Sequence, residues 1–137
     1  MCLQEALTEL CQIHSFKQVH HMISTVQAKA LSTISPVDII AATFPMGSMT
    51  GAPKISAMKI IESLENTKRG LYSGAVGYFT PEGNFDFNVV IRSILYNASK
   101  SYISFSVGSA ITSKSTPEKE YQECLVKAKA MRSVLEN

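Results

Sequence analysis

The sequence of 137 residues lacks the features of several broad protein classes. No apolar run approaches the roughly 18 residues that cross a membrane, and the N-terminus, with Glu5 so early, does not read as a signal peptide. Cys2, Cys11 and Cys124 form no CxxC motif, so we expect unpaired thiols in a reducing, cytoplasmic compartment. The 13 Lys and Arg against 11 Asp and Glu leave a net charge of only +2, which disfavours nucleic acid as a partner.

What remains is the composition of an ordinary globular domain. Hydrophobic residues make up 45% of the chain, which excludes a disordered protein, and no repeat or Gly-X-Y bias indicates a fibre. The length suits one domain with a core of its own.

The local patterns predict alternating groups of strands and helices. Residues 1–15 are ambiguous between a helix, which the leucine spacing favours, and a strand that begins near Cys11. A strand is expected at 16–26, followed by a short helix with Ser35 as N-cap that Pro45 ends. A loop at 47–54 leads into a helix that has Pro53 in its first turn and runs to about Asn66. Strands are expected at 71–80, 85–96 and 102–107, with a turn at 81–84, before a final helix that Thr116 caps and Pro117 begins. Strands in a meander between segregated helices indicate an α+β fold, an antiparallel sheet with flanking helices.

The final helix carries the sharpest chemical pattern. Glu120, Glu123 and Lys127 are spaced three and four residues apart, so all three project from one face. Two adjacent carboxylates repel unless a cation or a shared proton relieves them, and carboxylate oxygens at this spacing suit Mg²⁺. The alternative is a solvated face with an ordinary Glu–Lys pair, which spacing alone favours.

A glycine-containing loop precedes the middle helix. Gly47 and Gly51 leave backbone N–H groups free to hold a carboxylate or phosphate at the helix N-terminus. Lys54 is followed by Ile55 and not by Ser or Thr, so the loop is not a Walker A motif. A plain connection is an equally good interpretation.

Arg92 is expected within the strand at 85–96, where a guanidinium needs a partner. That partner is either Asp86, on the same face of the strand, or the acid of a substrate. Tyr72 is expected on the neighbouring strand with Gly74 and Gly77, whose missing side chains allow close approach.

His21 is expected on one face of the strand at 16–26, and a core histidine satisfied by a neighbour is the simpler interpretation. A zinc site is disfavoured, because the adjacent His20 and His21 point to opposite faces of a strand.

Four ordered segments together resemble the chorismate-utilising enzymes, most closely the aminodeoxychorismate synthase component I branch, with anthranilate synthase component I a near relative. The matching segments are SFKQVHHMISTV (15–26), FPMGSMTGAPKISAMKIIESLE (44–65), RGLYSGAVGYFTPEGNFDFNVVIRS (69–93) and VGSAITSKSTPEKEYQECLVKAKA (107–130). The resemblance implies the α+β chorismate-binding fold, chorismate as substrate, Mg²⁺ as cofactor and a glutaminase subunit as partner.

The resemblance also implies a role for nine residues. Glu120 and Glu123 match the acidic pair of the magnesium site, and Lys127 matches a lysine near the ring carboxylate of chorismate. Tyr72 and Arg92 match the pair that holds the enolpyruvyl carboxylate, and Gly108 and Ala110 match backbone donors to that carboxylate. His21 matches a histidine near the reacting edge of the ring, and Ser48 matches a hydroxyl close to the substrate.

Residues 1–137 depart from the family pattern in two ways. The sequence Gly108-Ser109-Ala110 replaces a glycine-richer run. The upstream helix that carries a further magnesium-binding glutamate, and the segment with the reactive lysine, have no counterpart here. We therefore expect one partial chorismate-binding domain, the C-terminal part of a longer catalytic chain, which is inactive alone and able to self-associate through open sheet edges.

Three functions remain open. The motif Ser48-Met49-Thr50-Gly51 favours aminodeoxychorismate synthase. This enzyme converts chorismate to 4-amino-4-deoxychorismate for para-aminobenzoate and folate synthesis. The alternatives are part of an anthranilate synthase component I and a short, non-catalytic binding protein of the same fold.

Overall fold

The computed structural model describes the backbone of residues 2–16 and 20–136, and the side chains of residues 8–16 and 20–136. The chain divides into two compact units, Met1–Phe44 and Pro45–Asn137. None of the helices in the described ranges is both long and apolar enough to cross a membrane.

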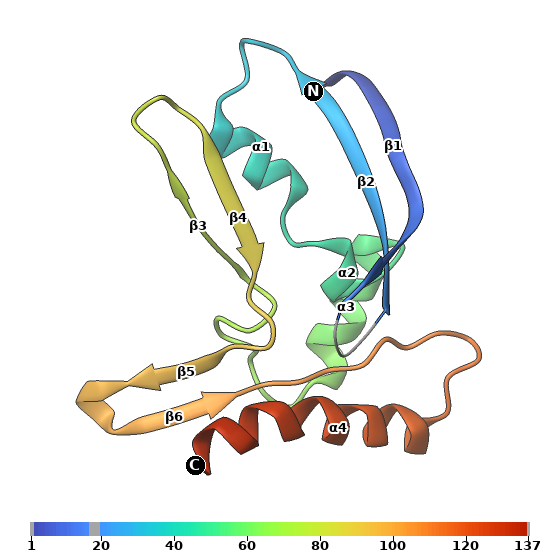
Figure 1. Cartoon of the computed structure of the whole chain (residues 1–137), viewed down its shortest axis with the longest axis vertical. Coiled ribbons are helices and arrows are strands. Elements are labelled where there is room, and N and C mark those ends of the chain that lie inside the picture. Colours follow the sequence, from blue (N-terminus) through green and yellow to red (C-terminus); the bar gives the residue numbers. More distant parts are fainter. Residues whose placement is uncertain (1, 17–19, 137) are drawn as a thin grey trace. The chain divides into compact units, whose positions relative to one another are not determined.

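The first unit is a long hairpin followed by one short helix. Strand β1 (Cys2–Ser15) pairs antiparallel with β2 (His20–Ala30), and His14 lies opposite His21 in the register. The ambiguous N-terminal segment is therefore a strand, because its backbone groups pair with β2 along most of its length (Figure 1). Residues 17–19 of the strand expected at 16–26 lie outside the described residues.

Helix α1 (Pro36–Thr43) begins and ends as expected. The hydroxyl of Ser35 accepts a hydrogen bond from the backbone N–H of Asp38 at 3.2 Å, and Pro36 occupies the first turn. The helix ends at Thr43, two residues before Pro45, which cannot continue it.

The helices of the second unit are α2 (Gly47–Thr50), α3 (Lys54–Leu64) and α4 (Pro117–Leu135). The expectation of an open loop at 47–54 is wrong in part, because Gly47–Thr50 forms one helical turn that Gly51 ends at φ +121°. Pro53 is the N-cap of α3 rather than its first residue. Thr116 occupies the N-cap of α4 without a capping side-chain bond, and Pro117 begins the helix as expected.

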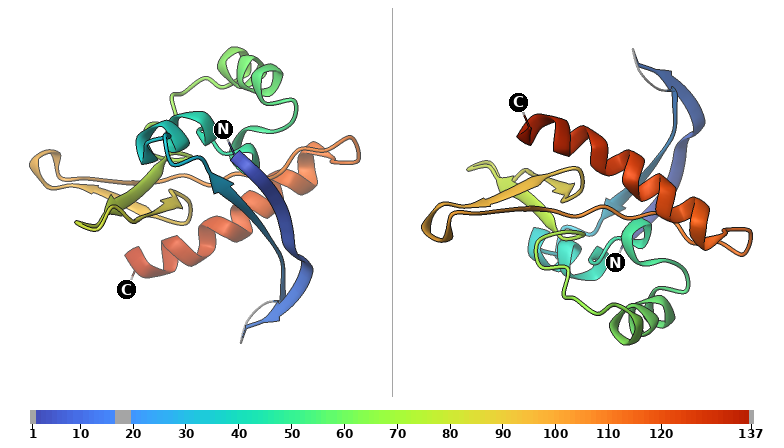
Figure 2. Two further views of the ribbon diagram at one scale, coloured as in Figure 1. Left: turned by 90° about the horizontal axis from the view of Figure 1, so that it is seen from above. Right: turned by 90° about the horizontal axis from the view of Figure 1, so that it is seen from below.

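The second unit contains two separate hairpins rather than a continuous sheet. Strand β3 (Ala75–Phe79) pairs with β4 (Phe85–Val89), and β5 (Ile94–Asn97) pairs with β6 (Tyr102–Phe105). The strand expected at 85–96 therefore breaks in two. The two hairpins point in different directions in Figures 1 and 2.

The break lies at Ile91 and Arg92. The N–H of Ile91 donates to the carbonyl of Val89 at 3.0 Å, and Arg92 has φ +51°, outside the extended region that regular strand residues adopt. Both the N–H and the carbonyl of Val90 instead bond the turn before β3, to Gly74 at 2.9 Å and Ser73 at 3.0 Å. Arg92 consequently lies in a coil and not on the strand face predicted for it.

Few described side chains are buried. Val90 and Met131 are the hydrophobic residues less than a tenth exposed within the described ranges, whereas side chains such as Leu64, Val126 and Ile111 are about 70% exposed or more. The expected core of one domain is therefore thin, and hydrogen bonds such as Arg69–Met49 and Lys127–Gly108 link separate segments of the second unit.

Candidate functional site

The second unit contains a pocket of about 670 Å³. It is formed by α2, the segment after α3, the coil between β4 and β5, the coil after β6, and α4. The lining residues are Ser48, Met49, Glu65, Asn66, Thr67, Lys68, Arg69, Tyr72, Ile91, Arg92, Ser106, Val107, Gly108, Ser109, Ala110, Lys127 and Met131. Six of the nine predicted site residues, Ser48, Tyr72, Arg92, Gly108, Ala110 and Lys127, are thus brought to one cavity of a size usual for small-molecule sites.

Helix α4 and the coil after β6 are tied together at the pocket. The ammonium group of Lys127 donates to the carbonyl of Gly108 at 3.0 Å and pairs with Glu123 at 2.5 Å. The hydroxyl of Ser109 donates to the carboxylate of Glu120. Figure 1 shows this coil running beside α4 before it turns back into the helix.

The acidic pair flanks the pocket without lining it. Hydrogen bonding from Lys127, and then its charge, lowers the pKa of the Glu123 carboxyl, so this group is ionised at neutral pH. The ordinary Glu–Lys pair is therefore present at Glu123. The described residues include no cluster of three or more metal-ligating side chains. Carboxylate oxygens are the ligands that Mg²⁺ prefers, and Glu120 and Glu123 bring two carboxylates to one face of α4.

Tyr72 lies in the turn before β3 and not on the strand predicted for it. Its hydroxyl is so close to Gly108 that a Cβ atom at that glycine would lie 2.7 Å away. Burial raises the pKa of the Tyr72 phenol, and the positive charges of Arg69 and Lys127 oppose that shift. The phenol is thus protonated at neutral pH and able to donate a hydrogen bond into the pocket.

Arg92 brings an exposed guanidinium to the pocket lining. No residue within the described ranges forms a hydrogen bond or ion pair with it, and Asp86 instead lies opposite Tyr78 in the β3–β4 register. The interpretation of Asp86 as the partner is therefore wrong.

Gly108 and Ala110 lie in the coil between β6 and α4. Their backbone N–H groups make no hydrogen bond to any described residue, while the carbonyl of Ala110 accepts from Ser115 at 3.3 Å. Ser48 is exposed within the single turn of α2. The Nζ atom of Lys54 donates to the carbonyl of Pro45 at 3.2 Å, and Lys54 does not line the pocket.

His21 lies on β2, in the first unit, and is half-buried. Its ring meets that of Phe16 edge-on, with centroids 5.8 Å apart. The neighbouring His20 bonds the hydroxyl of Ser15 at 2.9 Å. That His21 acts with the other eight residues stays a prediction.

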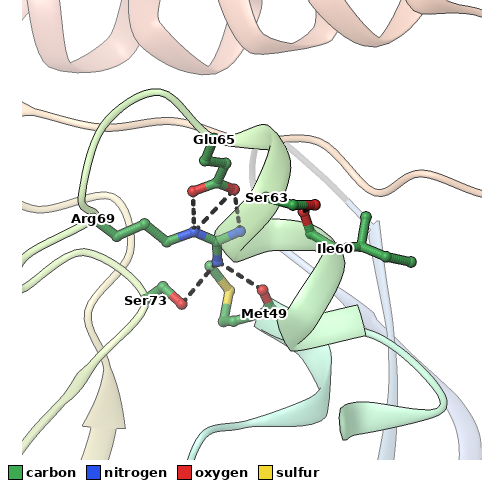
Figure 3. A network of polar contacts seen from close by, with 6 residues as sticks. All are labelled: Met49, Ile60, Ser63, Glu65, Arg69 and Ser73. Atoms are coloured by element: carbon green, nitrogen blue, oxygen red, sulfur yellow. Dashed lines mark hydrogen bonds and ion pairs between the residues drawn. The ribbon is translucent and has the colours of Figure 1, made fainter. Parts of the chain in front are cut away.

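The sequence patterns missed a network on the pocket wall around Arg69 (Figure 3). The guanidinium of Arg69 bonds both carboxylate oxygens of Glu65, at 2.5–3.1 Å, together with the carbonyl of Met49 and the hydroxyl of Ser73. The i, i+4 spacing of Glu65 and Arg69 was a detectable signal. It was obscured because α3 ends at Leu64, which places Arg69 outside the helix.

The sequence profile of chorismate binding enzymes matches residues 2–133, nearly the whole chain. The chain belongs to the chorismate binding enzyme family. Its α+β fold is that of the family: a crystal structure of anthranilate synthase component I from Streptococcus pneumoniae superposes with a TM-score of 0.79 at 34% identity, over 93% of this chain and 29% of that one.

Curated relatives of this chorismate binding enzyme carry two kinds of name. It is 47% identical to "Probable aminodeoxychorismate synthase, chloroplastic" of Oryza sativa subsp. japonica, over 93% of this chain and 14% of the relative. It is 41% identical to "Aminodeoxychorismate synthase component 1" of Bacillus subtilis, over 95% and 27%. It is 39% identical to "Anthranilate synthase component 1" of Aquifex aeolicus, over 91% and 25%. The chain therefore spans about a quarter or less of each of these relatives.

Proposed function

We propose that residues 1–137 carry the chorismate-binding part of an aminodeoxychorismate synthase, which aminates chorismate to 4-amino-4-deoxychorismate in the route to para-aminobenzoate and folate. One observation carries the proposal: six predicted site residues, the five substrate-binding ones and Ser48, come from five separate segments and line one pocket of about 670 Å³. Three relatives at 42–47% identity are named aminodeoxychorismate synthases and support this branch, while one relative at 42% identity is named an anthranilate synthase component 1.

Chorismate is a dianion, and the pocket offers donors suited to two carboxylates. The guanidinium of Arg92, which has no described protein partner, and the protonated phenol of Tyr72 hold the enolpyruvyl carboxylate. The backbone N–H groups of Gly108 and Ala110 bind the same carboxylate. Lys127 faces the ring carboxylate, and its bond to the Gly108 carbonyl keeps the ammonium group at the pocket wall.

Glu120 and Glu123 would hold Mg²⁺, together with ligands from outside residues 1–137. The bound ion supplies a positive charge that stabilises the leaving hydroxyl of the substrate. Ser109 orients the Glu120 carboxylate, and Lys127 keeps Glu123 ionised. Ser48 and His21 act near the reacting edge of the ring in this proposal, with ammonia delivered by a glutaminase partner.

The chain of 137 residues is expected to be catalytically silent by itself, because it carries neither a further magnesium-binding glutamate helix nor a reactive lysine segment. A cytoplasmic location and self-association through sheet edges also stay predictions, and two plant relatives are named chloroplastic.

The test is chromatographic product analysis with chorismate, Mg²⁺ and an ammonium salt. The complete polypeptide that carries residues 1–137 should form 4-amino-4-deoxychorismate, whereas the purified 137-residue chain should form none. Anthranilate as the product would establish the second candidate, which the Aquifex and Streptococcus relatives favour. If the complete polypeptide does not bind chorismate at all, neither synthase function holds. The remaining alternative is then a non-catalytic binding protein of the same fold.

A further inference from the structure

Arg69 joins three segments of the second unit on the pocket wall (Figure 3). Its Nη1 donates to the carbonyl of Met49 in α2 at 2.8 Å and to the hydroxyl of Ser73 at 3.1 Å. Its Nε and Nη2 grip the carboxylate of Glu65, the C-cap of α3. One side chain thus links α2, the end of α3 and the turn before β3.

The two groups that share Nη1 are sequence neighbours of two candidate site residues. Met49 follows Ser48, and Ser73 follows Tyr72. The Met49 carbonyl lies within the single helical turn Gly47–Thr50, so a shift of that carbonyl disturbs the turn that carries Ser48. A planar peptide joins Tyr72 to Ser73, so a shift of the Ser73 backbone moves Tyr72 as well.

Ser73 is held unusually firmly for a residue in a turn. It is only 8% exposed, and its φ of +70° is a left-handed conformation that non-glycine residues rarely adopt. Its N–H bonds the carbonyl of Val90 at 3.0 Å while its hydroxyl is held by Arg69. The turn that carries Tyr72 is therefore held by two bonds: one to the backbone of Val90, just after β4, and one to the guanidinium of Arg69, which also bonds α2.

Two of the other ion pairs among the described residues differ from this arrangement, whereas the cation of Lys127–Glu123 also reaches a second segment through the Gly108 carbonyl. Lys68–Glu62 and Arg132–Glu136 are well exposed, and neither cation of these pairs bonds a third segment. The Arg69 side chain is 25% exposed, and its planar fork takes both oxygens of the Glu65 carboxylate while it also holds a carbonyl and a hydroxyl.

We propose that Arg69 is a positioning residue of the pocket: by holding Met49 and Ser73 it sets where Ser48 and Tyr72 stand on the wall. Its effect on chorismate rests on the proposed function, whereas its effect on the two segments does not. Arg69 touches no substrate in this scheme and acts through its neighbours alone.

Arg69→Lys keeps the charge opposite Glu65 and loses the fork. The matched control is Arg132→Lys, which makes the same change in an exposed i, i+4 pair outside the pocket. Amide hydrogen exchange by mass spectrometry, without substrate, should show lost protection at residues 49–51 and 72–74 in Arg69→Lys, with α4 unchanged. Unchanged exchange at both segments would overturn the proposal.

Chorismate kinetics of the complete polypeptide test the consequence. Arg69→Lys should raise KM about tenfold with a smaller change in kcat, since a misplaced binding group costs affinity. A purely structural role would lower kcat through loss of folded protein at constant KM, and that outcome would refute positioning. If the wild-type protein does not use chorismate, the proposed function is wrong. The hydrogen-exchange result alone then tests whether Arg69 positions the two segments.

Ser73→Ala provides the second variant in case Arg69→Lys unfolds. It removes one hydroxyl that Arg69 holds and leaves the pair with Glu65 intact. Protection should fall at residues 72–74 and persist at 49–51. Equal loss at both segments, or at neither, would contradict a guanidinium that holds each segment separately.

Discussion

Gly108→Ala should displace Tyr72 and weaken chorismate binding with little loss of stability. A Cβ atom at position 108 would lie 2.7 Å from the hydroxyl oxygen of Tyr72, about 0.8 Å closer than the ~3.5 Å of an ordinary contact. The phenol is the end of a side chain and moves more readily than the backbone of residue 108. If the phenol binds a carboxylate of chorismate as proposed, a shift of this size is expected to raise KM for chorismate about tenfold.

The free energy of unfolding should change little. Gly108 is exposed and does not require a left-handed backbone, so alanine restricts the unfolded chain by about 0.4–1 kcal/mol and offsets part of the strain. The assay is chorismate KM in the complete polypeptide, with Tm measured beside it. Gly47→Ala is the matched control, because no atom lies within 4 Å of the added methyl group there.

A double substitution separates displacement of the phenol from any other effect. In a Tyr72→Phe background the clashing oxygen is absent, so adding Gly108→Ala should cost little further. The same tenfold rise in both backgrounds, or no rise in either, would refute the reasoning.

Three further predictions concern charged groups in the pocket or beside it. Glu123→Gln keeps the size and removes the charge of a proposed Mg²⁺ ligand, so Mg²⁺-dependent turnover should collapse while the circular dichroism spectrum is retained; wild-type turnover would end the metal assignment. Arg92→Lys loses the fork that grips a carboxylate and should raise KM for chorismate, and an unchanged KM would remove Arg92 from the site. Hydrogen bonding from Arg69 outweighs burial and lowers the pKa of the Glu65 carboxyl below its ordinary 4.5. This pair's stabilisation is therefore present above pH 4.5 and is lost as the pH falls through the folded pKa, so the difference in urea midpoint between wild type and Glu65→Gln should shrink from pH 7 to pH 3.5.

Local signals predicted the elements whose ends are set by a few neighbouring residues. Ser35 with Pro36 begins α1, and Thr116 with Pro117 begins α4, because caps and prolines act within one helical turn. The face shared by Glu120, Glu123 and Lys127 follows from helical geometry alone. Its internal ion pair, Glu123–Lys127, is of the kind that the spacing predicts.

The strand patterns were less informative. Residues 85–96 alternate like one strand, yet the chain breaks at Arg92 because Val90 bonds the turn before β3. A period of two does not reveal where the partner strand ends, so neither this break nor the division of the strands into separate hairpins was predictable.

The sequence by itself determined the family, the α+β class and the set of charged residues expected around a dianion. Only the tertiary structure decided which of them meet: Lys127 bonds Gly108, 19 positions away, and Arg69 bonds Met49, 20 positions away. The physical reason is the distance along the chain over which each interaction acts. Caps, turns and helix faces act over about four residues, whereas a pocket depends on the path of the chain between distant segments, which no local pattern specifies.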